Sequence, residues 1–153
     1  MKILIASEHA GYVLKEFLYH ALREGGYDIT DGGVYSNETS DYPIVAEKSC
    51  RLLVSGEYQY CILVCGTGIG MSIAANKVVG IRAALCTDLF SARMTREHND
   101  ANVLCLAAWK TADRYSLEIT KTFLSTAFTG DRHIRRVNQI SQIERRELGS
   151  KLE

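Results

Sequence analysis

The stretch Tyr60-Cys-Ile-Leu-Val-Cys-Gly-Thr-Gly-Ile-Gly-Met-Ser-Ile-Ala-Ala-Asn-Lys77 decides the fold. It begins with an apolar run, Cys61 to Val64, which contains β-branched residues and predicts a fully buried strand. An Ala-rich segment from Met71 to Lys77 favours a helix. Between them lie three glycines at alternate positions: Gly66, Gly68 and Gly70. A strand, a glycine-rich turn and a helix start gather backbone N–H groups at a positive helix end, which suits an anion, and Cys65 lies at the edge of this predicted cradle.

The glycine spacing excludes two nucleotide-binding motifs. The pattern is G-x-G-x-G rather than the G-x-G-x-x-G of dinucleotide folds, and it lies in the middle of the chain rather than after the first strand. The Gly-Lys-Ser/Thr ending of a P-loop is also missing, so a nucleoside triphosphate is not expected. The alternative is a tight βα turn in which the glycines only provide positive φ angles.

The length and composition predict one globular domain, residues 1–153. Hydrophobic residues make up 46% and charged residues 24%, which is typical of such proteins. Eighteen basic residues balance eighteen acidic ones, so no global field favours nucleic acid or an anionic membrane. Any anion site must therefore be local.

The cysteines and the start of the chain predict a reduced, cytoplasmic protein. The five cysteines are an odd number and include no Cys-x-x-Cys pair. The first residues lead directly into a strand without the longer apolar region of a signal peptide, and no apolar run is long enough to span a bilayer.

Strands and helices are expected to alternate along the chain. The expected strands are residues 2–6, 27–30, 61–64, 81–85 and 102–106. The expected helices are residues 12–23, 44–54, 71–77, 88–97, 112–128 and 134–148. This alternation predicts an α/β fold, a three-layer αβα sandwich around a parallel sheet of about five strands.

Several side chains could carry chemistry. Cys65 ends a strand beside backbone donors that favour its thiolate, so it could act as a nucleophile or general base; the alternative is a small buried hydrophobic residue. His9 follows the first strand, at the edge where open α/β sheets bind ligands. Cys86 and Cys105 also lie near strand ends, but without Cys-x-x-Cys or His-x-x-His spacing no metal site is predicted.

Two further groups lie in the second half of the chain. His98 and Asn99 follow a predicted helix at a loop that could face the ligand, where a histidine could shuttle protons and an asparagine hold an oxyanion; the alternative is a histidine that complements the helix dipole. Arg132 and Arg136 are four residues apart, so on a helix they share one face and could converge on a phosphate; a solvated charged face is the alternative.

Together these groups have the chemistry of aldose–ketose isomerisation of a sugar phosphate. A base removes a proton from the carbon next to the carbonyl, the amide cradle and Asn99 hold the enediolate oxygens, and the arginine pair holds the phosphate. This reaction requires no metal and no redox cofactor.

The chain also resembles the ribose-5-phosphate isomerase type B family, which includes galactose- and allose-6-phosphate isomerases. The resemblance covers nearly the whole chain. It rests on Asp41-Tyr-Pro43, Cys65 to Lys77, Gly80-Ile-Arg-Ala83, Ser91-Ala92, Arg96 to Asn102, Arg132-His133 and Arg136-Val137.

The resemblance implies a Rossmann-like homodimer, sometimes paired into tetramers, with a C-terminal helix for dimerisation and sites shared between subunits. Cys65 would be the base and Thr67 would support the proton transfer. His98 from the partner subunit would open the furanose ring. The remaining residues implied to bind substrate are Glu8, His9, Tyr42, Gly66, Gly68, Ile69, Gly70, Asn99, Arg132 and Arg136.

Two departures from the family pattern affect the choice of sugar. Glu8 replaces an aspartate, and Trp109 with Lys110 beside it stands where a substrate-binding arginine is usual. The expected reaction is the interconversion of ribose 5-phosphate and ribulose 5-phosphate. The alternatives are the same chemistry on an allose, galactose or tetrose phosphate, and a non-catalytic sugar-phosphate sensor.

Overall fold

The computed structural model describes residues 1–149, which form five strands and six α-helices. The strands are β1 (Lys2–Ser7), β2 (Asp28–Asp31), β3 (Tyr60–Cys65), β4 (Ala83–Leu85) and β5 (Val103–Ala107). A short 3-10 helix, η1 (His9–Gly11), precedes the first α-helix. The α-helices are α1 (Tyr12–Glu24), α2 (Tyr42–Val54), α3 (Ile69–Ala75), α4 (Leu89–Asn99), α5 (Asp113–Ser125) and α6 (Arg132–Gly149).

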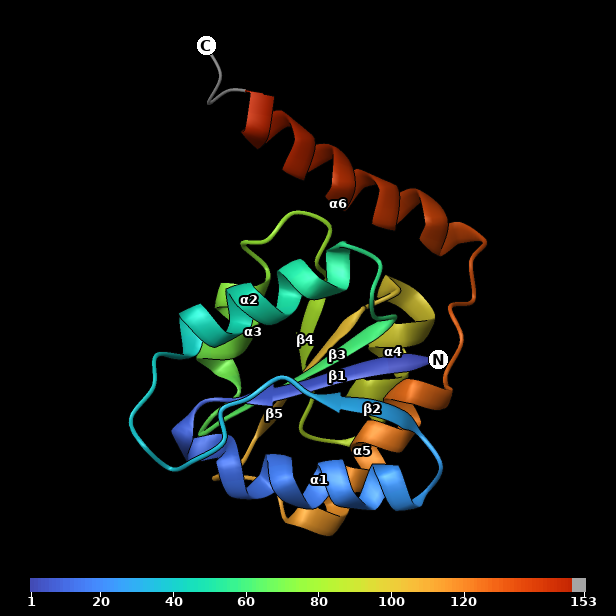
Figure 1. The fold of residues 1–153 in the computed structure, drawn as a ribbon. Helices are drawn as coiled ribbons and strands as arrows, with labels where there is room; N and C mark the ends of the chain where they lie inside the picture. The colour runs from blue at the N-terminus through green and yellow to red at the C-terminus, as the bar shows by residue number, and fades with distance from the viewer. Residues whose placement is uncertain (150–153) are drawn as a thin grey trace.

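All five strands run parallel in the order β2-β1-β3-β5-β4, which confirms the predicted three-layer α/β sandwich (Figure 1). The chain leaves β1 toward one side of the sheet to form β2, and then crosses back past β1 to form β3. The order therefore reverses between β1 and β3. Open α/β sheets bind ligands in the crevice outside the carboxyl ends of the strands at such a reversal.

The side chains of β3 alternate between two buried layers. Ile62 and Val64 pack with α1, α4 and α5 on one face of the sheet. Cys61, Leu63 and Cys65 pack with α2 and α3 on the other face. Because both faces are covered, β3 is apolar throughout, and this explains why its sequence shows no alternation of polar residues.

Helix α6 extends away from this sandwich (Figure 1). Of its described residues only His133 is buried, while Ile134, Ile140 and Ile143 are about half exposed. Glu144 ties the helix to the loop before β4 by accepting from the Gly80 N–H at 3.1 Å. Nearly the whole length of α6 thus presents side chains that its own chain does not cover.

The largest differences from the expected elements occur at helix ends, and the greatest is in the helix expected over residues 112–128, which ends at Ser125. The helix expected from Met71 begins at Ile69, because Gly68 adopts φ +72° and serves as the N-cap. The helix expected to stop at Glu97 continues to Asn99 and ends at Asp100, which has φ 47°. Within residues 1–149 no helix has both the length and the apolar character needed to cross a membrane.

Candidate active site

A cavity of about 190 Å³ lies at the carboxyl ends of β1 and β3, where the strand order reverses. Most of the residues predicted for the first half of the site line it. Its lining residues are Glu8, His9, Ala10, Tyr42, Cys65, Gly66, Thr67, Gly70 and Trp109. The cavity therefore lies in the crevice predicted by topology, and of the residues predicted for this half of the site only Gly68 and Ile69 do not line it.

Cys65 is the last residue of β3 and its side chain is buried at the base of this cavity. The Gly68 N–H donates to Cys65 Sγ across 3.1 Å. A backbone donor aimed at sulfur stabilises negative charge there, and the thiolate is the form of cysteine that attacks or accepts a proton. The neighbouring Thr67 Oγ1 accepts from the Ile69 N–H at 3.3 Å, so the loop orients both of its polar side chains with its own backbone.

The other four cysteines have raised pKa values and do not line the cavity. Burial raises the pKa of Cys50 to about 12 and that of Cys86 to about 11. It also raises the pKa values of Cys61 and Cys105 well above the usual value. These thiols remain protonated near neutral pH, and Cys65 is the only cysteine that lines the cavity.

The alternating glycines give the cavity its shape. A Cβ on Gly66 would lie 2.8 Å from the ring of Trp109, and one on Gly70 would lie 2.8 Å from the ring of Tyr42. The two aromatic rings therefore rest directly on the loop, and both residues line the cavity. Gly68 has the positive φ that turns its N–H toward Cys65, and a Cβ there would meet the Leu85 side chain at 2.4 Å.

The buried carboxylate of Glu8 pairs with the partly exposed imidazole of His9 at the end of β1. Glu8 Oε2 lies 2.7 Å from His9 Nδ1, and Ser40 Oγ accepts from the His9 N–H at 3.1 Å. The Ser40 N–H also approaches Nδ1, at 3.3 Å, but the carboxylate contact is shorter, so we assign the Nδ1 proton to the bond with Glu8. Glu8 Oε1 is buried without a hydrogen-bond partner in the described part of the chain. A substrate hydroxyl would satisfy this oxygen.

The remaining predicted residues lie together in a second cluster, at the end of α4 and the start of α6. The rings of His98 and His133 stack with their centroids 4.3 Å apart and an interplanar angle of 11°. Arg132 and Arg136 are exposed on the first turns of α6, and Asn99 is exposed at the end of α4. This cluster contains the residues for which the sequence predicts a proton-shuttling, an oxyanion-binding and a phosphate-binding role, namely His98, Asn99, Arg132 and Arg136.

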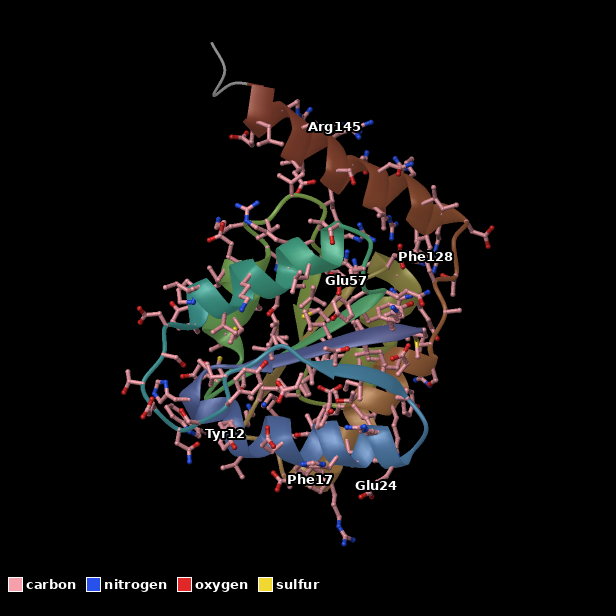
Figure 2. The ribbon with its side chains drawn as sticks, viewed as in Figure 1. Tyr12, Phe17, Glu24, Glu57, Phe128 and Arg145 are labelled. Atoms are coloured by element: carbon pink, nitrogen blue, oxygen red, sulfur yellow. The ribbon has the colours of Figure 1, made fainter. Side chains whose placement is uncertain are left out.

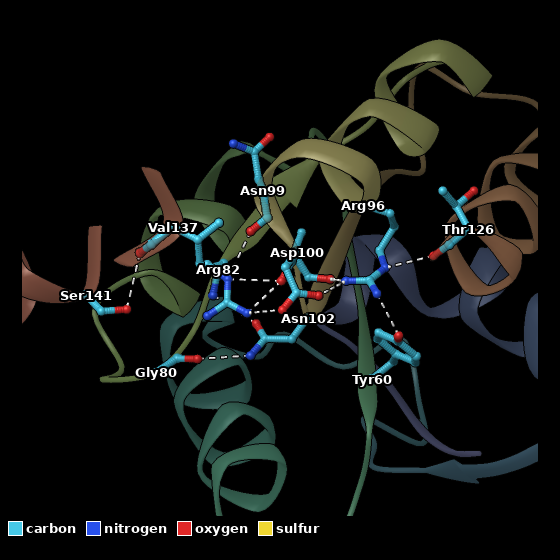
Figure 3. A network of polar contacts seen from close by, with 11 residues as sticks. Tyr60, Gly80, Arg82, Arg96, Asn99, Asp100, Asn102, Thr126, Val137 and Ser141 are labelled. Atoms are coloured by element: carbon cyan, nitrogen blue, oxygen red, sulfur yellow. Dashed lines mark hydrogen bonds and ion pairs between the residues drawn. The ribbon is translucent and has the colours of Figure 1, made fainter. Parts of the chain in front are cut away.

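A network of arginines and amides fixes the end of α4 (Figure 3). Arg82 donates to the carbonyls of Asn99 and Asp100, at 3.0 and 2.9 Å, and its Nη2 pairs with Asp100 Oδ2 at 3.0 Å. Arg96 pairs with Asp100 Oδ1 at 2.8 Å and donates to Tyr60 Oη at 2.8 Å. Asp100 thus joins two arginines while its left-handed backbone ends the helix directly after Asn99.

The two clusters lie at opposite edges of the sheet. Arg96 of the second cluster's helix contacts Tyr60, the first residue of β3, whereas Cys65 is its last residue. Tyr60 and Cys65 are five residues apart along β3, which at 3.3 Å per residue is a distance of about 16 Å. Figure 2 shows the same separation, with Tyr12 near the carboxyl ends of the strands and Phe128, which precedes α6, at the other end. Within one chain, the expectation that the His98 loop faces the same ligand as Cys65 is therefore wrong.

Sequence reasoning missed several residues that shape these clusters. It did not find Ser40, which holds His9 from a loop 31 residues away, or the Arg82–Asp100–Arg96 network. The sequence marks Trp109 only as a departure from a family pattern, yet it lines the cavity, whereas Lys110 does not. One signal was present: Arg96 shares the helical period of Ala92, which predicts that it faces inward.

The fold and the cavity define a Rossmann-like α/β domain with a thiol and a glycine-rich loop at the switch point of its sheet. The sequence profile of the ribose/galactose isomerase family matches residues 3–140. The chain is 39% identical over 145 residues to ribose-5-phosphate isomerase B of Escherichia coli, covering 95% of this chain and 97% of that protein. The chain belongs to the ribose/galactose isomerase family.

Two other relatives are informative. The structure of ribose-5-phosphate isomerase B from Clostridium thermocellum superposes with a TM-score of 0.94 at 47% identity, covering 96% of this chain and 99% of that one. A 4-deoxy-4-sulfo-D-erythrose isomerase from a Clostridium species is 41% identical over 134 residues, which cover 84% of this chain and 82% of that enzyme. The family thus includes a relative named for a four-carbon sulfonated sugar as well as relatives named for ribose 5-phosphate.

Proposed function

We propose that this protein interconverts ribose 5-phosphate and ribulose 5-phosphate through an enediolate, with Cys65 as the base. The observation that carries the proposal is the contact between the Gly68 N–H and Cys65 Sγ at the base of the cavity. The Cys65 thiolate takes the proton from C2 of the open-chain aldose and returns it to C1, with Thr67 supporting the transfer. The negative charge that develops on the two substrate oxygens is held by the backbone N–H groups of the loop Gly66 to Gly70, which includes Ile69, and by Asn99.

The remaining residues bind the rest of the sugar phosphate. Glu8 Oε1, which is buried and unpaired, accepts from a sugar hydroxyl, and Tyr42 forms the adjoining wall. His9, Arg132 and Arg136 hold the phosphate, since charge-assisted bonds to phosphate oxygens are strong. His98 opens the furanose ring before isomerisation.

The separation of the two clusters supports a homodimer with shared sites. One chain holds Cys65 and His98 at opposite edges of its sheet, so a site that uses both requires the second cluster of another copy. Helix α6 offers the uncovered apolar side chains that such an interface needs. In this arrangement each dimer has two sites, and each site combines the cavity of one subunit with the His98 cluster of its partner.

Mixing two inactive variants tests the shared site. Cys65→Ala lacks the base and His98→Asn lacks the ring-opening group, so each homodimer has two defective sites. A dimer with one subunit of each kind has one site in which both residues are intact, so random reassociation restores about one quarter of wild-type activity. Reassociation that yields mixed dimers without activity would contradict sharing. Native mass spectrometry, with one variant labelled with nitrogen-15, would confirm that mixed dimers formed.

Two single variants test the roles of individual residues. Cys65→Ala abolishes isomerisation and keeps phosphate binding, whereas the matched variant Cys86→Ala, which removes a thiol outside the cavity, retains turnover. Substantial activity of Cys65→Ala would remove Cys65 from the role of base. Arg136→Ala raises KM more than it lowers kcat, and an unchanged KM would argue against a phosphate contact.

A second candidate function is the same chemistry on a shorter, four-carbon anion. Two observations favour it: the Trp109 ring covers Gly66 where the family resemblance leads one to expect an arginine, and one relative is named for a sulfonated tetrose. Measurement of kcat/KM on four-, five- and six-carbon aldose phosphates separates the two functions. Turnover of none of them would favour a sensor.

A further inference from the structure

His133 is a buried residue that the proposed mechanism does not use. It lies in the first turn of α6, where the neighbouring Arg132 and Ile134 are exposed, and its ring packs flat against that of His98. A centroid distance of 4.3 Å with an 11° interplanar angle leaves no room for another group between the rings. One face of the His98 imidazole is therefore fixed by His133.

The contacts of His133 keep its ring neutral. Arg132 Nε donates to His133 Nε2 at 3.4 Å, which requires that nitrogen to carry a lone pair and leaves the proton on Nδ1. Burial lowers the pKa of His133, and the positive charges of His98, Arg132 and Arg136 lower it further, against a smaller opposite effect of Asp131. A neutral partner permits His98 to gain and lose a proton without a second cation stacked on it.

The backbone holds the two rings together from both sides. His133 donates its N–H to the Gly130 carbonyl at 2.9 Å. Thr129 donates its N–H and its hydroxyl to the Glu97 carbonyl, at 3.2 and 2.7 Å. The linker before α6 is thus bonded to the residue that precedes His98, so the position of one ring determines that of the other.

We propose that His133 is a positioning residue that holds the His98 imidazole, by stacking, in the orientation required to open the furanose ring. The proposal rests on the ring-opening role given to His98 under the proposed function. In ring opening the C1–O4 bond breaks, a C1=O1 double bond forms, O4 gains a proton and O1 loses one. A single imidazole that carries this proton must lie close to both oxygens, and therefore a freely rotating His98 would perform the step poorly.

A comparison of cyclic and acyclic substrates tests this role. Ribose 5-phosphate is largely cyclic, whereas erythrose 4-phosphate cannot close a furanose ring because its O4 carries the phosphate. The variants are His133→Ala, which removes the stacked ring, and His133→Phe, which keeps a flat ring at that position. His20→Ala, a histidine on the exposed face of α1, is the control.

We expect His133→Ala to lower kcat/KM for ribose 5-phosphate at least about tenfold and to change that for erythrose 4-phosphate less than about threefold. His133→Phe should restore ribose 5-phosphate turnover to within about threefold of wild type, because the stack survives without the bond from Arg132. Equal losses on both sugars, or no loss on either, would overturn the proposal. Activity on the acyclic sugar also reports that each variant is folded and assembled.

A measurement that does not depend on turnover completes the test. In the wild-type protein the ring current of His133 shifts the His98 Cε1–H proton resonance upfield, and the resonance is assigned by its absence in His98→Asn. The shift should disappear in His133→Ala and persist in His133→Phe. An unshifted wild-type resonance would show that the rings do not stack in solution and would overturn the proposal. If the wild-type protein isomerised neither sugar, the proposed function would fail, and the resonance alone would decide whether His133 orients His98.

Discussion

Replacing Arg96 by methionine tests how strongly the network at the end of α4 stabilises the fold. The Arg96 guanidinium is buried and makes four hydrogen bonds, to the Tyr60 hydroxyl, to Asp100 Oδ1 and to the carbonyls of Ala101 and Thr126. It also lies over the Tyr60 ring, 4.8 Å from its centroid. Methionine retains most of the apolar stem, so the substitution removes mainly the charge and its bonds.

The magnitude follows from what is left behind. The Ala101 carbonyl is buried and loses its 2.6 Å bond, and an unsatisfied buried polar group costs about 1–3 kcal/mol. Asp100 loses one of two arginine partners but keeps Arg82 at 3.0 Å, which limits the cost of the unpaired charge. We therefore expect the free energy of unfolding to fall by about 3–5 kcal/mol. For a chain of this length this corresponds to a fall in Tm of about 10 °C.

The assay is thermal unfolding at one fixed protein concentration, with urea unfolding to give the free energy. Arg93→Met is the matched control, because Arg93 lies on the same helix with its side chain exposed and should change the stability by less than about 0.5 kcal/mol. A loss below about 1 kcal/mol in Arg96→Met would refute the reasoning. It would mean that Arg82 alone holds Asp100 and that the remaining bonds of Arg96 are replaced by water.

Three further predictions concern single residues. Iodoacetamide at neutral pH should label Cys65 before the four other cysteines, because burial raises the pKa values of those four thiols. Peptide mass mapping identifies the labelled cysteines. Labelling of a second thiol at the same rate as Cys65 would contradict the prediction. Gly68→Ala should lower kcat/KM at least about a hundredfold, because a side chain at φ +72° meets the Leu85 side chain and displaces the N–H from Cys65; near-normal kinetics would contradict this. Burial lowers the pKa of His133, so as the pH drops below 6.5 this histidine is protonated more readily in the unfolded chain than in the folded one. The Tm should therefore fall with pH in this range, and it should fall less in His133→Phe. Parallel curves of Tm against pH for the two proteins would contradict this.

The sheet and half of the site could be predicted from the sequence because they follow from periodicity and polarity. A run such as Cys61 to Val64 that is apolar at every position fits a strand covered on both faces, and parallel strands place their carboxyl ends at one edge. Glu8 and Cys65 each follow such a run, so their meeting in one cavity needed no knowledge of side-chain packing.

The sequence could not show why glycine is required at Gly66 and Gly70, because the side chains that contact them belong to other parts of the chain. Gly66 leaves room for Trp109, which follows β5, and Gly70 leaves room for Tyr42, which begins α2. Of the three alternating glycines only Gly68 has a positive φ, so the alternative of a turn whose glycines only provide positive φ angles does not explain Gly66 and Gly70. The same holds for Asp100, whose left-handed conformation ends α4: aspartate is rarely a helix terminator, and its two arginine partners are 4 and 18 residues away.

The position of the second cluster shows how much the order of elements alone can decide. A residue at the end of a parallel strand and a residue at the end of the helix that returns from such a strand lie at opposite edges of the sheet, since strand and helix run antiparallel. Cys65 ends a strand and His98 lies in the last turn of α4, so no rotamer or loop rearrangement within one chain brings them together. A proton-transfer mechanism that needs both therefore implies a second copy before any interface is known. In the proposed dimer His133 lies in the same shared site as His98, because its ring stacks on that of His98, and its substitution should therefore affect ring opening rather than the enediolate chemistry at Cys65.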